Sequence, residues 1–398
     1  MGKRLPLLEF IILTALLFSL IAFGTDAMLP AFGQIAADLH TPNVNRVQLI
    51  VAAFVLGTGC GQLVSGPLSD AIGRKPVLLG GISVFIAASF WAWGTQSLEM
   101  LLVARFIQGL GISAPRTVGM AMVRDLYAGR EMARVVSLAM MMFVLVPAVA
   151  PLIGQGIMLA FGWRAIFLSF VVMSGLVGLW LWIRQEETHI LEKRRPVKVS
   201  TMLAAVREMV QSKRVIVSLL VLCMSYSIIF SYISSAQQVF VDWLDAGTRF
   251  PTYFAIIALV SGTASALNAA LVVRLGMWLM STIGLALIAI FSLTGGTLIY
   301  LGVFEGHALL IFFIGWSMTL FFLSGLVFSN VNALAMEPMG HIAGTASAII
   351  GAVSTLASIV IAVPIGQMFN GTGLPLMFGV GTCAVIGFGL NLTNPRNV

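Results

Sequence analysis

Three ionisable side chains lie inside long apolar stretches of this sequence. Asp26 occurs in TDAMLPAF, and Arg105 and Arg116 occur in ARFIQGLGISAPR. A charged group inside a membrane helix costs roughly 2.5–3.5 kcal/mol on insertion scales, so each of these residues is a candidate for function. A carboxylate beside a guanidinium can bind and release a proton, hold a polar substrate, or join two helices.

The spacing of these residues predicts a polar site. If the stretch with Asp26 runs outward and the stretch with the two arginines runs inward, Asp26 and Arg105 lie at similar depth, within about two helical turns. Arg105 and Arg116 are 11 positions apart, about 20° from a common helix face, and Gln108 lies close to the same stripe. Two roles remain open for Asp26 and Arg105: an exchange site for protons and substrate, or a structural pair that joins two helices.

The composition indicates that these stretches are membrane helices. The chain is 59% hydrophobic and only 9% charged over 398 residues, too few charges for a soluble surface of this size. The three cysteines have no metal-ligand spacing, and the four histidines lie at ends of apolar runs or in loops. We therefore expect no metal, no cofactor and no enzymatic activity.

Twelve apolar runs are long enough to span a bilayer, which needs about 20 residues each. They divide the chain into residues 1–183, a polar linker at 184–214 and residues 215–398. The sequence predicts an all-α membrane protein with two pseudo-symmetric six-helix bundles. The predicted spans are residues 7–32, 46–66, 76–95, 98–123, 134–159, 163–183, 215–240, 251–273, 276–301, 307–334, 341–369 and 373–393.

The lysines and arginines predict the orientation, because basic residues concentrate on the cytoplasmic side of membrane proteins. With the N-terminus inside, only Arg46, Arg164 and Arg249 face outward. Both termini and the linker are then cytoplasmic, and the net charge of +7 reflects topology rather than nucleic-acid binding. The predicted inner set is Lys3, Arg4, Arg74, Lys75, Arg124, Arg130, Arg134, Arg184, Lys193, Arg194, Arg195, Lys198, Arg207, Lys213, Arg214, Arg274 and Arg396.

The stretch SGPLSDAIGRKP, residues 65–76, is predicted to form the inner turn between the second and third spans. Gly66 and Pro67 are expected to end one helix, Gly73 to allow a tight turn, and Pro76 to begin the next helix. The stretch resembles the loop signature of the major facilitator superfamily, G-x-L-[AS]-D-x-x-G-R-[KR], although Ala71 stands where a basic residue is common.

That resemblance implies a conformational switch. Asp70 would pair with basic groups at the inner end of the fourth span, where Arg124, Asp125 and Arg130 occur, or with the positive end of the eleventh span near His341. The residues implied in the switch are Gly66, Asp70, Gly73, Arg74, Lys75, Arg124 and Asp125.

Further motifs resemble those of drug:proton antiporters. Arg105, Gln108 and Gly109 match R-x-x-Q-G of the fourth span, and Asp26 matches the acid of D-x-x-L-P in the first. The fifth span resembles the antiporter motif through Pro147, Pro151 and Gly154, with two of its glycines missing. The resemblance implies that protons and substrate compete at Asp26, with Arg105 adjusting the balance.

Longer segments, including MVRDLYAGREMARVVS, resemble the bicyclomycin and chloramphenicol exporters of the Bcr/CflA type. We expect proton-coupled export of amphipathic small molecules by a monomer in the bacterial inner membrane, with substrate held between the bundles. The alternative is proton-coupled transport of a metabolite, whereas a membrane enzyme or a receptor is disfavoured by the residues. Expected substrate contacts are Asp26, Gln108, Arg116, Tyr226, Phe230, Tyr232 and Gln237. For the aromatic residues, packing within the helix bundle is the competing role.

Overall fold

The chain forms helices throughout the part that the computed structural model describes, residues 5–190, 192, 194 and 199–395. Among these described residues, eleven helical segments are long and apolar enough to cross a membrane, and one of them, Gly306–Gln367, contains two long helices in succession. The predicted all-α membrane fold is confirmed. Of the inner basic set, Lys3, Arg4, Lys193, Arg195, Lys198 and Arg396 lie outside the described residues.

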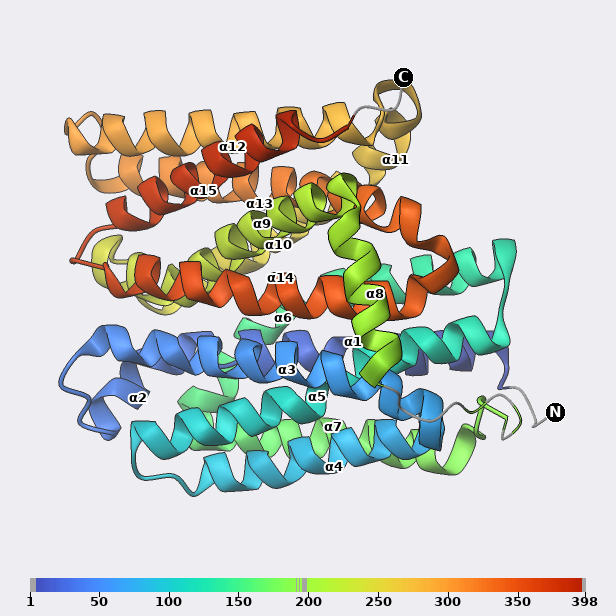
Figure 1. The fold of residues 1–398 in the computed structure, drawn as a ribbon. Coiled ribbons are helices and arrows are strands. Elements are labelled where there is room, and N and C mark those ends of the chain that lie inside the picture. Colours follow the sequence, from blue (N-terminus) through green and yellow to red (C-terminus); the bar gives the residue numbers. More distant parts are fainter. Residues whose placement is uncertain (1–4, 191, 193, 195–198, 396–398) are drawn as a thin grey trace. The chain divides into compact units, whose positions relative to one another are not determined.

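Contacts within the chain divide it into two compact units. The first comprises residues 1–42 and 53–203, and the second comprises residues 43–52 and 204–398. The helices of the first unit are α1 (Leu7–Asp26), η1 (Leu29–Ala31), α2 (Phe32–Asp38), most of α3 (Leu49–Ile72), α4 (Arg74–Trp93), α5 (Leu98–Leu126), α6 (Gly129–Phe161) and α7 (Arg164–Arg184). Within this unit α4 packs against α5 and α7, and α1 packs against α5, α6 and α7 (Figure 1).

The second unit contains the remaining long helices. Its elements are η2 (Val44–Gln48), α9 (Lys213–Gln238), η4 (Val239–Trp243), η5 (Gly247–Arg249), α10 (Phe250–Gly262), α11 (Ala264–Leu275), α12 (Met277–Tyr300), α13 (Gly306–Met336), η6 (Glu337–Ile342), α14 (Ala343–Gln367) and α15 (Leu374–Leu392). Helix α9 packs against α13, α14 and α15. Helix α8 (Val199–Gln211) crosses the boundary between the two units in the sequence and lies within the stretch that we predicted only as a polar linker.

The join between α3 and α4 differs from the predicted turn. Helix α3 continues through Gly66 and Pro67 to Ile72, and α4 begins at Arg74, so only Gly73 lies between them. Gly73 has a φ of 109°, which a glycine adopts without strain and which reverses the chain in one residue. Pro76 falls in the first turn of α4, where a missing N–H costs little.

Candidate functional site

The first unit buries a polar cluster around Arg105, whose side chain is 0% exposed. Its Nη2 donates to the carbonyl oxygen of Gly24 at 2.9 Å, and its Nη1 donates to Oε1 of Gln108 at 2.9 Å. The guanidinium also lies over the ring of Phe54, 4.1 Å from the centroid, a favourable cation–π geometry. Arg105 on α5 is therefore in contact with both α1 and α3.

Gln108 extends this cluster to α4. Its Nε2 donates to Oγ of Ser89 at 2.7 Å, and Ser89 in turn donates to the carbonyl of Phe85 at 2.7 Å. Both side chains are completely buried. Buried polar groups are stable when they are hydrogen-bonded, and this chain of bonds satisfies an arginine, an amide and a hydroxyl together. The cluster thus connects four helices of the unit.

Asp26 is the last residue of α1 and is only 5% exposed. It lies two positions after Gly24, whose carbonyl oxygen accepts a hydrogen bond from Arg105. The antiporter-like segment of α6 reaches the same place, because a Cβ added at Gly154 would collide with the backbone carbonyl of Ala27. The structure therefore places Gly154, Asp26 and the Arg105 cluster around one end of α1.

Pro147 and Pro151 lie inside α6, which continues to Phe161 without a break. Arg116 lies apart from the buried cluster: its side chain is exposed, and it is 11 positions along α5 from Arg105. Sequence spacing predicted a shared helix face for the two arginines, but only one of them is buried.

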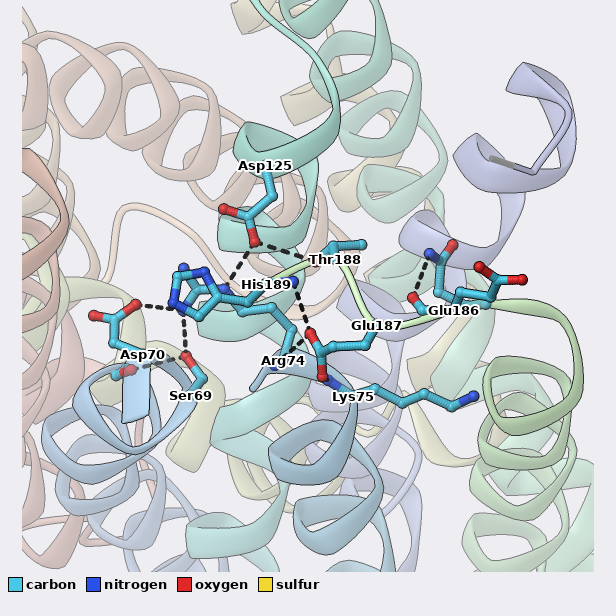
Figure 2. A network of polar contacts seen from close by, with 11 residues as sticks. Ser69, Asp70, Arg74, Lys75, Asp125, Glu186, Glu187, Thr188 and His189 are labelled. Carbon is cyan, nitrogen blue, oxygen red and sulfur yellow. Dashed lines mark hydrogen bonds and ion pairs between the residues drawn. The ribbon is translucent and has the colours of Figure 1, made fainter. Parts of the chain in front are cut away.

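A second polar network surrounds Arg74, at the first residue of α4 (Figure 2). Its Nη1 donates to Oγ of Ser69 at 2.7 Å and also to Oδ1 of Asp70, and its Nε donates to Oδ2 of Asp125 at 3.0 Å. The side chain of Arg74 is 8% exposed. A nearly buried guanidinium that bonds two carboxylates is a strong, geometrically defined contact. It joins the end of α3 to the end of α5.

The pairing within this network differs from our expectation. We expected Asp70 to contact Arg124 or Arg130, or the start of the eleventh span near His341. In the structure Asp70 pairs with Arg74, and Arg74 joins it to Asp125. Arg124 and Arg130 are exposed. Lys75 instead turns toward α7, where its Nζ donates to the carbonyl of Trp182 at 2.7 Å.

Sequence reasoning missed the segment after α7, which completes the network. The carboxylate of Glu187 accepts from the backbone N–H of Arg74 at 2.9 Å and from that of Lys75 at 3.0 Å, the free donors at the start of α4. It also accepts from the N–H of His189, and Thr188 donates to Asp125 at 3.1 Å. Figure 2 shows these residues lying together around the start of α4.

Gly73 is part of the same arrangement. A Cβ at this position would lie 2.5 Å from Oε2 of Glu187, so the carboxylate approaches the chain where only glycine leaves room. In the sequence, the signal for Glu187 was limited to its place in a charged stretch, 114 positions after Gly73. Two residues of the buried cluster, Ser89 beside Gln108 and Phe54 beside Arg105, gave no signal because isolated serines and aromatic residues are common in membrane helices.

In the second unit, the predicted substrate residues separate into two clusters. Tyr226 stacks with Phe230 at 5.8 Å between ring centroids and meets Phe328 edge-on at 4.5 Å. Tyr232 is 0% exposed and packs against Phe313, Trp316 and Phe321, the surroundings of a core residue. Gln237 is 5% exposed near the end of α9.

Comparison with known proteins agrees with this fold. Residues 14–362 match the profile of the Major Facilitator Superfamily. A bicyclomycin resistance protein homolog of Haemophilus influenzae is 29% identical, over 97% of this chain and 96% of its own. A chloramphenicol resistance protein of Pseudomonas aeruginosa is 42% identical over 38% of this chain and 36% of its own. Among solved structures, a D-xylose-proton symporter superposes with a TM-score of 0.79 at 15% identity, covering 98% of both chains.

Proposed function

This chain belongs to the Major Facilitator Superfamily and is a membrane transporter, and on that premise we propose that it exports drug-like amphipathic molecules in exchange for protons. The observation that carries the proposal is the placement of Asp26 at the end of α1, two residues from the carbonyl that Arg105 contacts. A buried acid and a buried cation therefore lie on adjoining parts of α1 and α5 in the first unit. The names of the two relatives, which refer to resistance to bicyclomycin and chloramphenicol, support export rather than uptake.

In this mechanism Asp26 carries the exchanged proton. Substrate and proton bind in alternation at Asp26 or beside it, and Arg105 favours the ionised form when the proton leaves. The ion pairs of Arg74 with Asp70 and Asp125 form in one conformation and open in the other. We further propose that the protein works as a monomer in the bacterial inner membrane, with both termini in the cytoplasm.

The test uses purified protein in liposomes that contain a pH-sensitive dye. A proton gradient is imposed, and chloramphenicol-like, bicyclic and cationic compounds are added singly. We expect proton movement opposite to the transported compound. Proton movement in the same direction as a metabolite, with no response to any drug, would replace export by metabolite symport.

Asp26→Asn tests the role of the acid. The amide keeps the shape but cannot exchange a proton, so drug-driven proton movement should be abolished while expression remains normal. The matched control is Asp38→Asn, which removes an exposed carboxylate paired with Arg164 and should leave transport unchanged, since exposed pairs contribute about 1 kcal/mol or less. Normal proton coupling in Asp26→Asn would remove Asp26 from the mechanism.

A further inference from the structure

Arg116 lies far from both ends of the membrane helix α5. It is 18 positions from the start of α5 at Leu98 and 10 from its end at Leu126. At 1.5 Å per residue these separations are about 27 and 15 Å, against a hydrocarbon core of about 30 Å. Unlike Arg105, which is completely buried, Arg116 is exposed.

The exposed side of Arg116 is not the lipid-facing side of α5. At 100° per residue Arg116 is about 20° from Arg105, whose side chain points to α1 and α3. The exposed apolar residues Met100 and Val103 lie about 140–160° away on the same helix. Lipid therefore contacts the face of α5 opposite to Arg116.

The neighbours of Arg116 along α5 support this assignment. A Cβ at Gly119 would contact the ring of Phe18 on α1 at 3.0 Å. Met120 packs against the buried cluster of Ala15, Phe18 and Ala139, which α1 and α6 contribute. Arg116 is thus on the side of α5 that faces α1 and α6. An exposed guanidinium at this depth in a membrane helix requires water or a polar ligand.

No described carboxylate forms an ion pair with Arg116. Asp26, the candidate acid of the first unit, is buried at the end of α1. The accessible charge at mid-membrane depth in this unit is therefore positive. A guanidinium binds carboxylate and other oxyanion groups through two parallel hydrogen bonds.

We propose that Arg116 is a specificity-determining residue that selects substrates with an anionic group. The inference rests on the proposed transport function and names its substrate class: amphipathic acids, whose oxyanion contacts Arg116 and whose apolar body packs on neighbouring side chains such as Met120. Methionine suits this purpose because its flexible, polarisable side chain adapts to ligands of different shape.

The experiment compares three compounds of similar shape: naphthaleneacetate, naphthaleneacetamide and naphthylethylamine. Each is tested for transport in proteoliposomes and for binding to detergent-solubilised protein by calorimetry. For the wild type we expect the acid to bind most tightly. Arg116→Gln should weaken binding of the acid about 10–100-fold, as expected for loss of a charge-assisted pair, and change that of the amide less than about twofold.

Two further variants separate specificity from folding. Arg116→Lys keeps the charge and should bind the acid more tightly than Arg116→Gln, and Arg116→Glu should prefer the amine. The matched control is Arg249→Gln, at an exposed arginine in the second unit, which should change none of the three affinities. Melting temperatures of all variants identify any that fail to fold.

The outcomes distinguish this inference from the proposed function. Equal affinity of the wild type for acid, amide and amine, or an equal loss of all three in Arg116→Gln, would overturn the role of Arg116, while drug-driven proton movement would still support export. Absence of proton movement with every compound would overturn the proposed exchange. The calorimetric comparison would then still decide whether Arg116 selects anions.

Discussion

At the scale of single residues, Arg105 shows how the fold stabilises a charge inside a membrane. A guanidinium can donate to Gly24 and Gln108 while its face rests on Phe54, because it is planar and carries donors on several edges. An ammonium group is a point charge and cannot reproduce this arrangement. The geometry therefore requires arginine and not merely a positive charge.

Arg105→Lys tests this requirement. We expect transport to fall about tenfold or more, because at least one charge-assisted hydrogen bond is lost. The measurement is the initial rate of drug-driven proton movement, normalised to the amount of reconstituted protein. Arg249→Lys, at an exposed arginine, serves as the control. Full activity of Arg105→Lys would show that transport requires only the positive charge of Arg105 and not its hydrogen-bond geometry.

The sequence was sufficient to single out Asp26, Arg105 and Gln108, because polar residues in apolar stretches are conspicuous and their spacing is helical. It was not sufficient to distinguish the environments of Arg105 and Arg116, which share a helix face. Their difference arises from tertiary contacts, because Gly24 of α1 and Phe54 of α3 contact Arg105 whereas Arg116 is exposed, and such contacts leave no local pattern.

At the scale of elements, the start of α4 depends on a residue from a distant segment. Free N–H groups at a helix start are normally capped by the side chain just before the helix, but here Gly73 has no side chain. Glu187 supplies the carboxylate instead, and its negative charge also complements the helix dipole. The segment after α7 is thereby fastened to the same network as Arg74.

Glu187→Ala should lower the free energy of unfolding by about 1–3 kcal/mol, because the N–H groups of Arg74 and Lys75 lose their acceptor. Thermal melting in detergent measures the loss. If the network also controls switching, the transport rate should fall while the half-saturating drug concentration changes little.

The control for this prediction is Glu192→Ala, which removes an exposed carboxylate five positions later. A similar melting temperature for both variants would show that Glu187 does not stabilise the start of α4.

At the scale of the whole molecule, the composition and the length of the apolar runs were enough to predict a helical membrane protein. Most helix positions follow from hydropathy, since lipid requires long apolar helices. The α3–α4 join was predicted wrongly because Gly66 and Pro67 resemble a helix end, whereas a membrane helix accommodates proline inside a span. Helix α8 was missed because its charged surroundings masked its periodicity.

The predicted orientation is testable by labelling. Cysteines placed at Arg130 and at Arg249 should react with an impermeant maleimide from opposite sides of the membrane, the first from the cytoplasm and the second from outside. The native Cys60, Cys223 and Cys383 lie within helices and should be replaced beforehand by alanine. Labelling of both positions from the same side would contradict the proposed topology.

The single residue between α3 and α4 has a consequence for how this protein can vary. An insertion at Gly73 would displace the N–H groups that Glu187 binds and shift Arg74 away from Asp70 and Asp125. Insertions, deletions and fusion tags should therefore be rejected at this position. The position of Glu192, whose side chain is exposed, should accept them, and a library of random insertions screened for drug resistance should recover survivors there and none at Gly73.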